Sequence, residues 1–77
     1  MTYTILAFNY AHSDYNNPYF VRESSDLADA KRVAEERFRD LAGYGHGRVV
    51  VLPLNPLTGY YDLPAVYERE KPFPLSR

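Results

Sequence analysis

The chain has 77 residues, with nine basic and ten acidic side chains, eight tyrosines, and neither cysteine nor tryptophan. A chain this short forms a single domain with a small core. The absence of thiols excludes disulfides and cysteine-based zinc sites. A net charge of −1 lacks the basic excess of a phosphate-binding surface, so nucleic acid is a disfavoured partner.

Nothing in the sequence predicts a membrane segment. The longest apolar run covers residues 49–54 and includes Pro53, whereas a bilayer-spanning helix needs about 20 apolar residues. The first residues, Met-Thr-Tyr-Thr-Ile-Leu, lack the positive charge that opens a signal peptide. We therefore expect a cytoplasmic protein with no membrane partner.

The first third of the chain predicts two strands. Residues 2–10 carry apolar side chains on both alternating faces, which is typical of a central strand. One face holds Tyr3, Ile5 and Ala7, and the other holds Leu6, Phe8 and Tyr10. Residues 11–18 are polar and turn-forming, and residues 19–24 predict a second, shorter strand.

A helix follows, because apolar residues recur at helical spacing after Ser25 or Asp26, either of which can cap its first turn. Asp29 lies three residues after Asp26, as in a capping box with Asp in place of Glu. Gly43 is the expected end of the helix. The apolar stripe consists of Leu27, Ala30, Ala34, Phe38 and Leu41.

Residues 48–54 predict a third strand, and Asn55-Pro56-Leu57-Thr58-Gly59 predicts a turn closed by a glycine of positive φ. We expect a hairpin in which Leu54 faces Tyr61 and Leu52 faces Leu63. Pro64 should then make the fourth strand an edge or interrupt it.

These elements predict an α+β fold, a small single-domain ββαββ arrangement with one amphipathic helix packed on an antiparallel sheet. The domain is expected to cover residues 1–68. Residues 69–77 are expected to form an extended or mobile tail, because Pro72 and Pro74 cannot continue a strand.

The candidate catalytic and ligand-binding residues do not form a convincing site. His12, Ser13 and Asp14 are adjacent in a polar loop, whereas triad members normally converge from separate elements. The glycine-rich residues 43–47 follow a helix, so they would face the negative end of its dipole and not cradle a phosphate. Two histidines, the second being His46, give little basis for a metal site. We expect no enzymatic activity, cofactor or metal.

The tyrosines point instead to a binding surface, since eight of them exceed what so small a core can bury. Tyrosine and arginine are enriched where proteins meet partners, although sheets also favour tyrosine for its propensity alone. Val33 lies off the apolar stripe, where it either flanks the core or forms a contact on the outer side of the helix. The candidate partner-binding residues are Tyr15, Tyr44, Tyr60, Tyr61, Val33 and Arg37.

The helical segment DLADAKRVAEERF, preceded by a strand pair, resembles many small proteins of bacteria and their phages. It is also distantly similar to the N-terminal part of HicB-type antitoxins, over about half of the chain, and this resemblance implies a binding role without assigning a residue. We expect a protein–protein interaction module, of the type of a phage or mobile-element inhibitor or adaptor of a host protein. The alternatives are a small homodimeric structural protein and a HicB-like, nucleic-acid-associated regulator.

Overall fold

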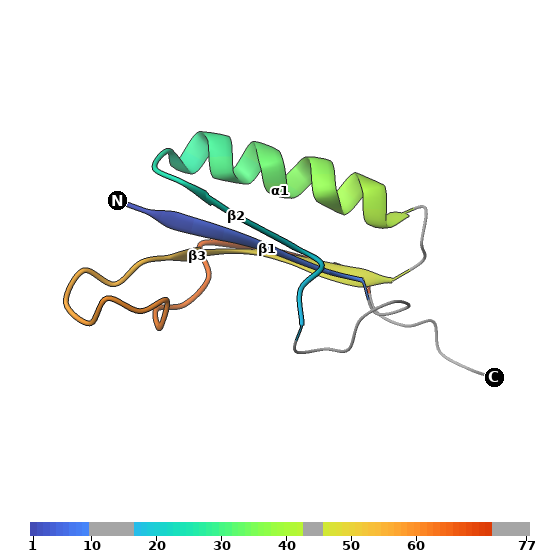
Figure 1. Ribbon diagram of the computed structural model, residues 1–77. Helices are drawn as coiled ribbons and strands as arrows, with labels where there is room; N and C mark the ends of the chain where they lie inside the picture. Colours follow the sequence, from blue (N-terminus) through green and yellow to red (C-terminus); the bar gives the residue numbers. More distant parts are fainter. Residues whose placement is uncertain (10–16, 43–45, 72–77) are drawn as a thin grey trace.

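A computed structural model describes residues 1–9, 17–42 and 46–71. Its elements are β1 (Tyr3–Asn9), β2 (Phe20–Ser24), α1 (Leu27–Ala42), β3 (Gly47–Pro53) and β4 (Tyr67–Lys71). The helix lies across one face of a four-stranded sheet (Figure 1). The predicted α+β fold with ββαββ order is confirmed. No helix in these ranges is long and apolar enough to cross a membrane.

The sheet has the order β2-β1-β3-β4, with antiparallel neighbours throughout. The central position predicted for the first strand is therefore correct for β1. Ile5 lies opposite Arg22 on one side and Val51 on the other. Because directly opposite residues on neighbouring strands point to the same side of a sheet, these three positions share the face that the helix covers. The other face also has buried side chains, Phe8 and Val50.

The core lies between α1 and the sheet, and consists of Ile5, Ala7, Ala30, Val33, Ala34, Leu41, Val49 and Val51. Ala30 and Ala34 are fully buried, and their small side chains let the helix lie close to the strands. Val33 is only 3% exposed, so the hypothesis that it contacts a partner is wrong. The helix covers a broad sheet, and its buried arc is correspondingly wider than the narrow stripe predicted.

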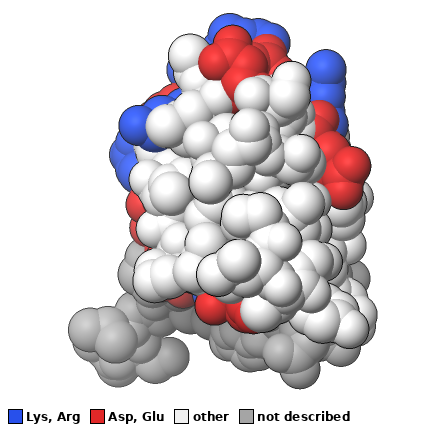
Figure 2. All heavy atoms as spheres, turned by 90° about the vertical axis from the view of Figure 1, so that its left-hand side faces the viewer, with Lys and Arg blue, Asp and Glu red and all other residues white. Residues whose placement is uncertain are grey.

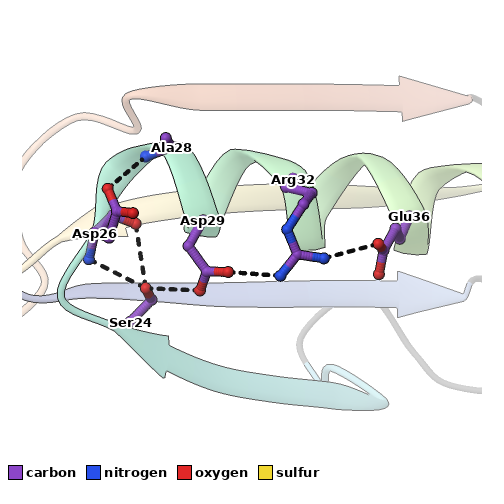
Figure 3. A network of polar contacts seen from close by, with 6 residues as sticks. All are labelled: Ser24, Asp26, Ala28, Asp29, Arg32 and Glu36. Carbon is purple, nitrogen blue, oxygen red and sulfur yellow. Dashed lines mark hydrogen bonds and ion pairs between the residues drawn. The ribbon is translucent and has the colours of Figure 1, made fainter.

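The start of α1 is held by a chain of polar contacts (Figure 3). Asp26 is the cap, since its Oδ1 accepts a hydrogen bond from the Ala28 amide at 3.1 Å. The Asp26 amide donates to Ser24 Oγ at 3.1 Å, and that hydroxyl donates to Asp29 Oδ2 at 3.0 Å. Asp29 therefore acts through Ser24, and does not bond the cap residue directly as in a capping box. Arg32 extends the chain with contacts to Asp29 at 2.6 Å and Glu36 at 2.9 Å.

The edge strand β4 corrects two predictions. The strand expected directly after the turn does not form, and Tyr67–Lys71 pairs with β3 instead, with Val51 opposite Tyr67. Residues 69–71 of the expected tail therefore belong to the sheet; residues 72–77 lie outside the described ranges. The charged sequence YEREK can form a strand here because an edge strand is exposed to water, which solvates its charged side chains. Successive side chains point to opposite faces, so Tyr67 and Glu68 lie on different sides of the sheet.

Contacts from α1 fasten β4 to the domain. The Tyr67 hydroxyl donates to Glu35 Oε2, and the Arg69 guanidinium lies 3.4 Å from the same oxygen. Arg69 also stacks over the Phe38 ring, 4.4 Å from its centroid. Similar stacking places Arg37 4.0 Å from the Phe20 centroid on β2. The helix thus reaches both edge strands through arginine–aromatic contacts.

Gly47 opens β3 at a point of close backbone approach. A Cβ at this position would lie 2.2 Å from the Phe8 carbonyl oxygen and 2.9 Å from a Leu41 methyl carbon. Part of the glycine-rich segment therefore has a packing role where the strand meets β1 and α1. The rest of that segment, residues 43–45, lies outside the described ranges.

Candidate protein-binding surface

The turn segment, residues 54–66, links β3 to β4 at the end of the sheet where the chain begins (Figure 1, orange). Its first residue, Leu54, donates its amide to the Thr2 carbonyl at 2.8 Å. Its last residue, Val66, donates to the Val51 carbonyl at 2.9 Å. Both ends of the segment are therefore tied to the sheet.

Backbone hydrogen bonds close the turn around Asn55. The Asn55 amide donates to the Tyr60 carbonyl and the Gly59 amide donates to the Asn55 carbonyl, both at 2.8 Å. The Asn55 side chain accepts from the Leu57 amide at 2.9 Å. Gly59 has φ +76°, as the sequence predicts for the glycine at this position.

Side chains fix the second half of the turn segment. Thr58 Oγ1 accepts from the Tyr60 amide at 3.2 Å and donates to Asp62 Oδ2 at 3.0 Å. The Tyr61 hydroxyl donates to Glu23 Oε2 on β2 at 3.0 Å. Since Glu23 lies on the sheet face opposite the helix, this bond carries the segment across that face to the far edge strand. The chain is thereby held away from the hairpin ladder that the sequence predicts.

The turn segment exposes apolar side chains despite its ordered backbone. Leu57 is 93% exposed and Tyr60 is 70% exposed. Leu63 and Met1 are also exposed at this end of the molecule. We call Met1, Leu57, Tyr60 and Leu63 the uncharged end. Figure 2 faces this end and shows a broad area without Lys, Arg, Asp or Glu, with charged side chains around it.

The structure places the predicted binding residues in different environments. Tyr60 is exposed in the uncharged end, while Tyr61 is half-buried and bonded to Glu23. Arg37 is half-buried against Phe20 and lies 3.8 Å from Asp40. Val33 is in the core. Tyr15 and Tyr44 lie outside the described residues, as do His12, Ser13 and Asp14.

The titratable groups of this region act as hydrogen-bond partners. Partial burial and the Glu23 carboxylate raise the pKa of Tyr61, so its hydroxyl remains a donor at neutral pH. Within the described ranges, no group of three or more His, Asp or Glu side chains is placed to hold a metal ion. The arrangement offers contact area and fixed geometry, which are the properties of a binding surface.

Leu57 is the exposed residue that the sequence pattern does not single out, because the pattern predicts only its place in a turn. A signal was present: turns favour Gly, Pro, Asn, Asp and Ser, and a leucine between Pro56 and Thr58 has no local role there. Comparisons with protein-family models, curated proteins and solved structures find no match to this chain.

Proposed function

We propose that this chain is a non-enzymatic protein-binding module of the inhibitor or adaptor type, and that it binds its partner through the uncharged end. The observation that carries the proposal is the 93% exposure of Leu57 on a hydrogen-bonded turn. A large apolar side chain gains free energy when it leaves water. Among the residues that the structure describes, none shields Leu57 from water, and docking into another molecule would supply this gain.

The order of the turn segment supports this proposal. Binding through a mobile loop costs the conformational entropy of ordering it. Here the Asn55, Thr58 and Tyr61 hydrogen bonds hold the segment in place before any partner arrives. Leu57 and Tyr60 are therefore preorganised anchors, and an aromatic anchor beside an aliphatic one is typical of interface hot spots.

The chemistry of the surface indicates the kind of partner. The uncharged end contributes no Lys or Arg side chain to meet phosphates, so a nucleic acid would gain little there. Its most exposed side chain projects from a turn, and its complement is a concave apolar pocket. We therefore assign the partner to the proteins that carry such a pocket, ringed by polar groups that can face the charged rim.

The test compares capture by three forms of the protein, each tagged at the C-terminus because Met1 belongs to the surface under test. The forms are the wild type, Leu57→Asp, and Val21→Lys as a matched control that charges an exposed valine on β2. Proteins captured from the native host are identified by mass spectrometry. Each is then purified and titrated against the three forms by calorimetry.

A specific partner should bind the wild type and Val21→Lys alike, and should lose at least about tenfold in affinity with Leu57→Asp, which puts a charge into an apolar pocket. Circular dichroism verifies that the variants are folded. A partner that binds Leu57→Asp as tightly as the wild type contradicts the proposed surface, and so does the absence of any partner whose binding survives purification.

A further inference from the structure

Two strand edges of the sheet have no neighbouring strand within the described ranges, the outer edges of β2 and β4. Unpaired edges can template pairing with another strand. On β2, Val21 is 61% exposed, on the face opposite the helix by its position across from Leu6. The two edges differ in which side chains would lie opposite one another if each strand paired with its own copy.

The symmetry of self-pairing limits the registers to compare. Two identical antiparallel strands in one sheet are related by a twofold axis that passes midway between one residue and its own copy, which lie opposite each other. For β2, only registers centred on Val21, Arg22 or Glu23 oppose three or more residues of Phe20–Ser24. Centring on Arg22 or Glu23 places like charges face to face, which destabilises a pair.

The register centred on Val21 is free of this conflict. Within Phe20–Ser24, it places valine opposite valine and Phe20 opposite Arg22. Each copy would gain an apolar pair at the axis and a guanidinium beside an aromatic ring.

The β4 edge offers no equivalent register. Centring Tyr67–Lys71 on Glu68 or Glu70 opposes two glutamates, and centring it on Arg69 opposes two arginines. Each of these registers brings like charges together at the axis. Alternating charge of this kind protects an edge strand against self-association.

We propose that two copies of this chain associate through their β2 edges, with Val21 opposite the partner's Val21, to form one continuous antiparallel sheet. The twofold axis is perpendicular to that sheet, so both helices lie on the same face. The charge pattern of the two edges selects both the strand and the register. This association uses a different surface from the uncharged end and does not depend on the proposed function.

Sedimentation equilibrium over a range of protein concentrations tests the association. Wild type and Leu57→Asp should dimerise with equal affinity, whereas Val21→Lys should raise the dissociation constant by about tenfold or more, because it opposes two lysines at the axis. Val21 is largely exposed, so this variant should keep the monomer fold. A wild type that is monomeric up to millimolar concentration overturns the proposal, and so does a Val21→Lys variant that dimerises normally.

Single cysteines test the register, since the natural chain has none. Val21→Cys places two thiols directly opposite one another, within the range that a disulfide can bridge after small adjustment. Glu23→Cys places them four residues out of register. Under mild oxidation the first variant should form a covalent dimer at least about tenfold faster than the second, as expected for paired and unpaired thiols. Equal rates, or a faster Glu23→Cys reaction, overturn the proposed register.

Discussion

At the scale of single residues, Gly59 shows how one backbone conformation supports the proposed binding surface. Its φ of +76° lies in the region that side chains disfavour. A Cβ there would have no atom within 4 Å, so any cost of substitution comes from the backbone and not from a clash. The turn that presents Leu57 depends on this conformation.

We expect Gly59→Val to lower the free energy of unfolding by about 1–2 kcal/mol, because a β-branched residue resists positive φ. Urea unfolding followed by circular dichroism measures it. Gly59→Asn is the matched control and should cost less, since asparagine tolerates this region. A valine variant as stable as the wild type would show that the turn does not require this glycine.

Tyr67 is the second residue with a measurable consequence. Burial and the Glu35 carboxylate raise the pKa of its hydroxyl in the folded state. The fold therefore favours the neutral form, so this stabilisation is complete below the unfolded pKa, near 10. It is lost as pH rises through the higher folded value.

Thermal unfolding between pH 8 and pH 12 should therefore show a loss of stability above about pH 10 that is smaller in Tyr67→Phe. Tyr61 has a raised pKa as well, so Tyr61→Phe serves as the comparison and the double variant should show the smallest loss. An alkaline profile that is the same in all four proteins contradicts this assignment.

At the scale of elements, the start of α1 couples helix stability to acid. The hydrogen bonds from Arg32 and from Ser24 lower the pKa of Asp29. Its contribution is therefore present above the unfolded pKa, near 3.9, and disappears as pH falls through the lower folded value. We expect Asp29→Asn to flatten the acid limb of the stability profile between about pH 5 and pH 2. Ser24→Ala should do so in part, and an unchanged acid limb in Asp29→Asn contradicts the coupling.

The helix is joined to β4 through Phe38, which is partly buried against the core and covered by Arg69. We expect Phe38→Ala to cost about 2–3 kcal/mol, less than the ~3–5 kcal/mol of a fully buried phenylalanine. Phe38→Leu, which keeps most of the apolar contact, should cost less than half as much. Denaturant unfolding distinguishes the two, and a native stability for Phe38→Ala would place the ring outside the core.

The elements were predictable to different degrees. Two-sided apolarity identified β1 as central, and periodicity with an acidic cap identified α1. The strand after the turn was misplaced because local turn chemistry predicts reversal of the chain but not where pairing resumes. That point depends on long-range contacts, Tyr61 with Glu23 and Tyr67 with Glu35. Counting tyrosines predicts that some of them are exposed, and Tyr60 is one that is, whereas the exposure of Leu57 depends on how the folded turn projects.

At the scale of the whole molecule, association and stability should be linked. A small core leaves a domain marginally stable, and a dimer formed only by folded chains adds stability by mass action. The melting temperature of the wild type should therefore rise with protein concentration. In Val21→Lys it should be nearly independent of concentration, as differential scanning calorimetry at several concentrations can measure. Equal concentration dependence in the two proteins contradicts the link.

The position of the turn segment determines how the two binding surfaces of a dimer would be arranged. It lies at the end of the sheet where β2 finishes, since Ser24 pairs with Tyr3 and Tyr3 with Pro53. Antiparallel association through β2 sends the two turn segments toward opposite ends of the joint sheet. Such an assembly is divalent but cannot place both Leu57 side chains on one small partner. It would bridge two partner molecules, so a module of this size could act as a cross-linker.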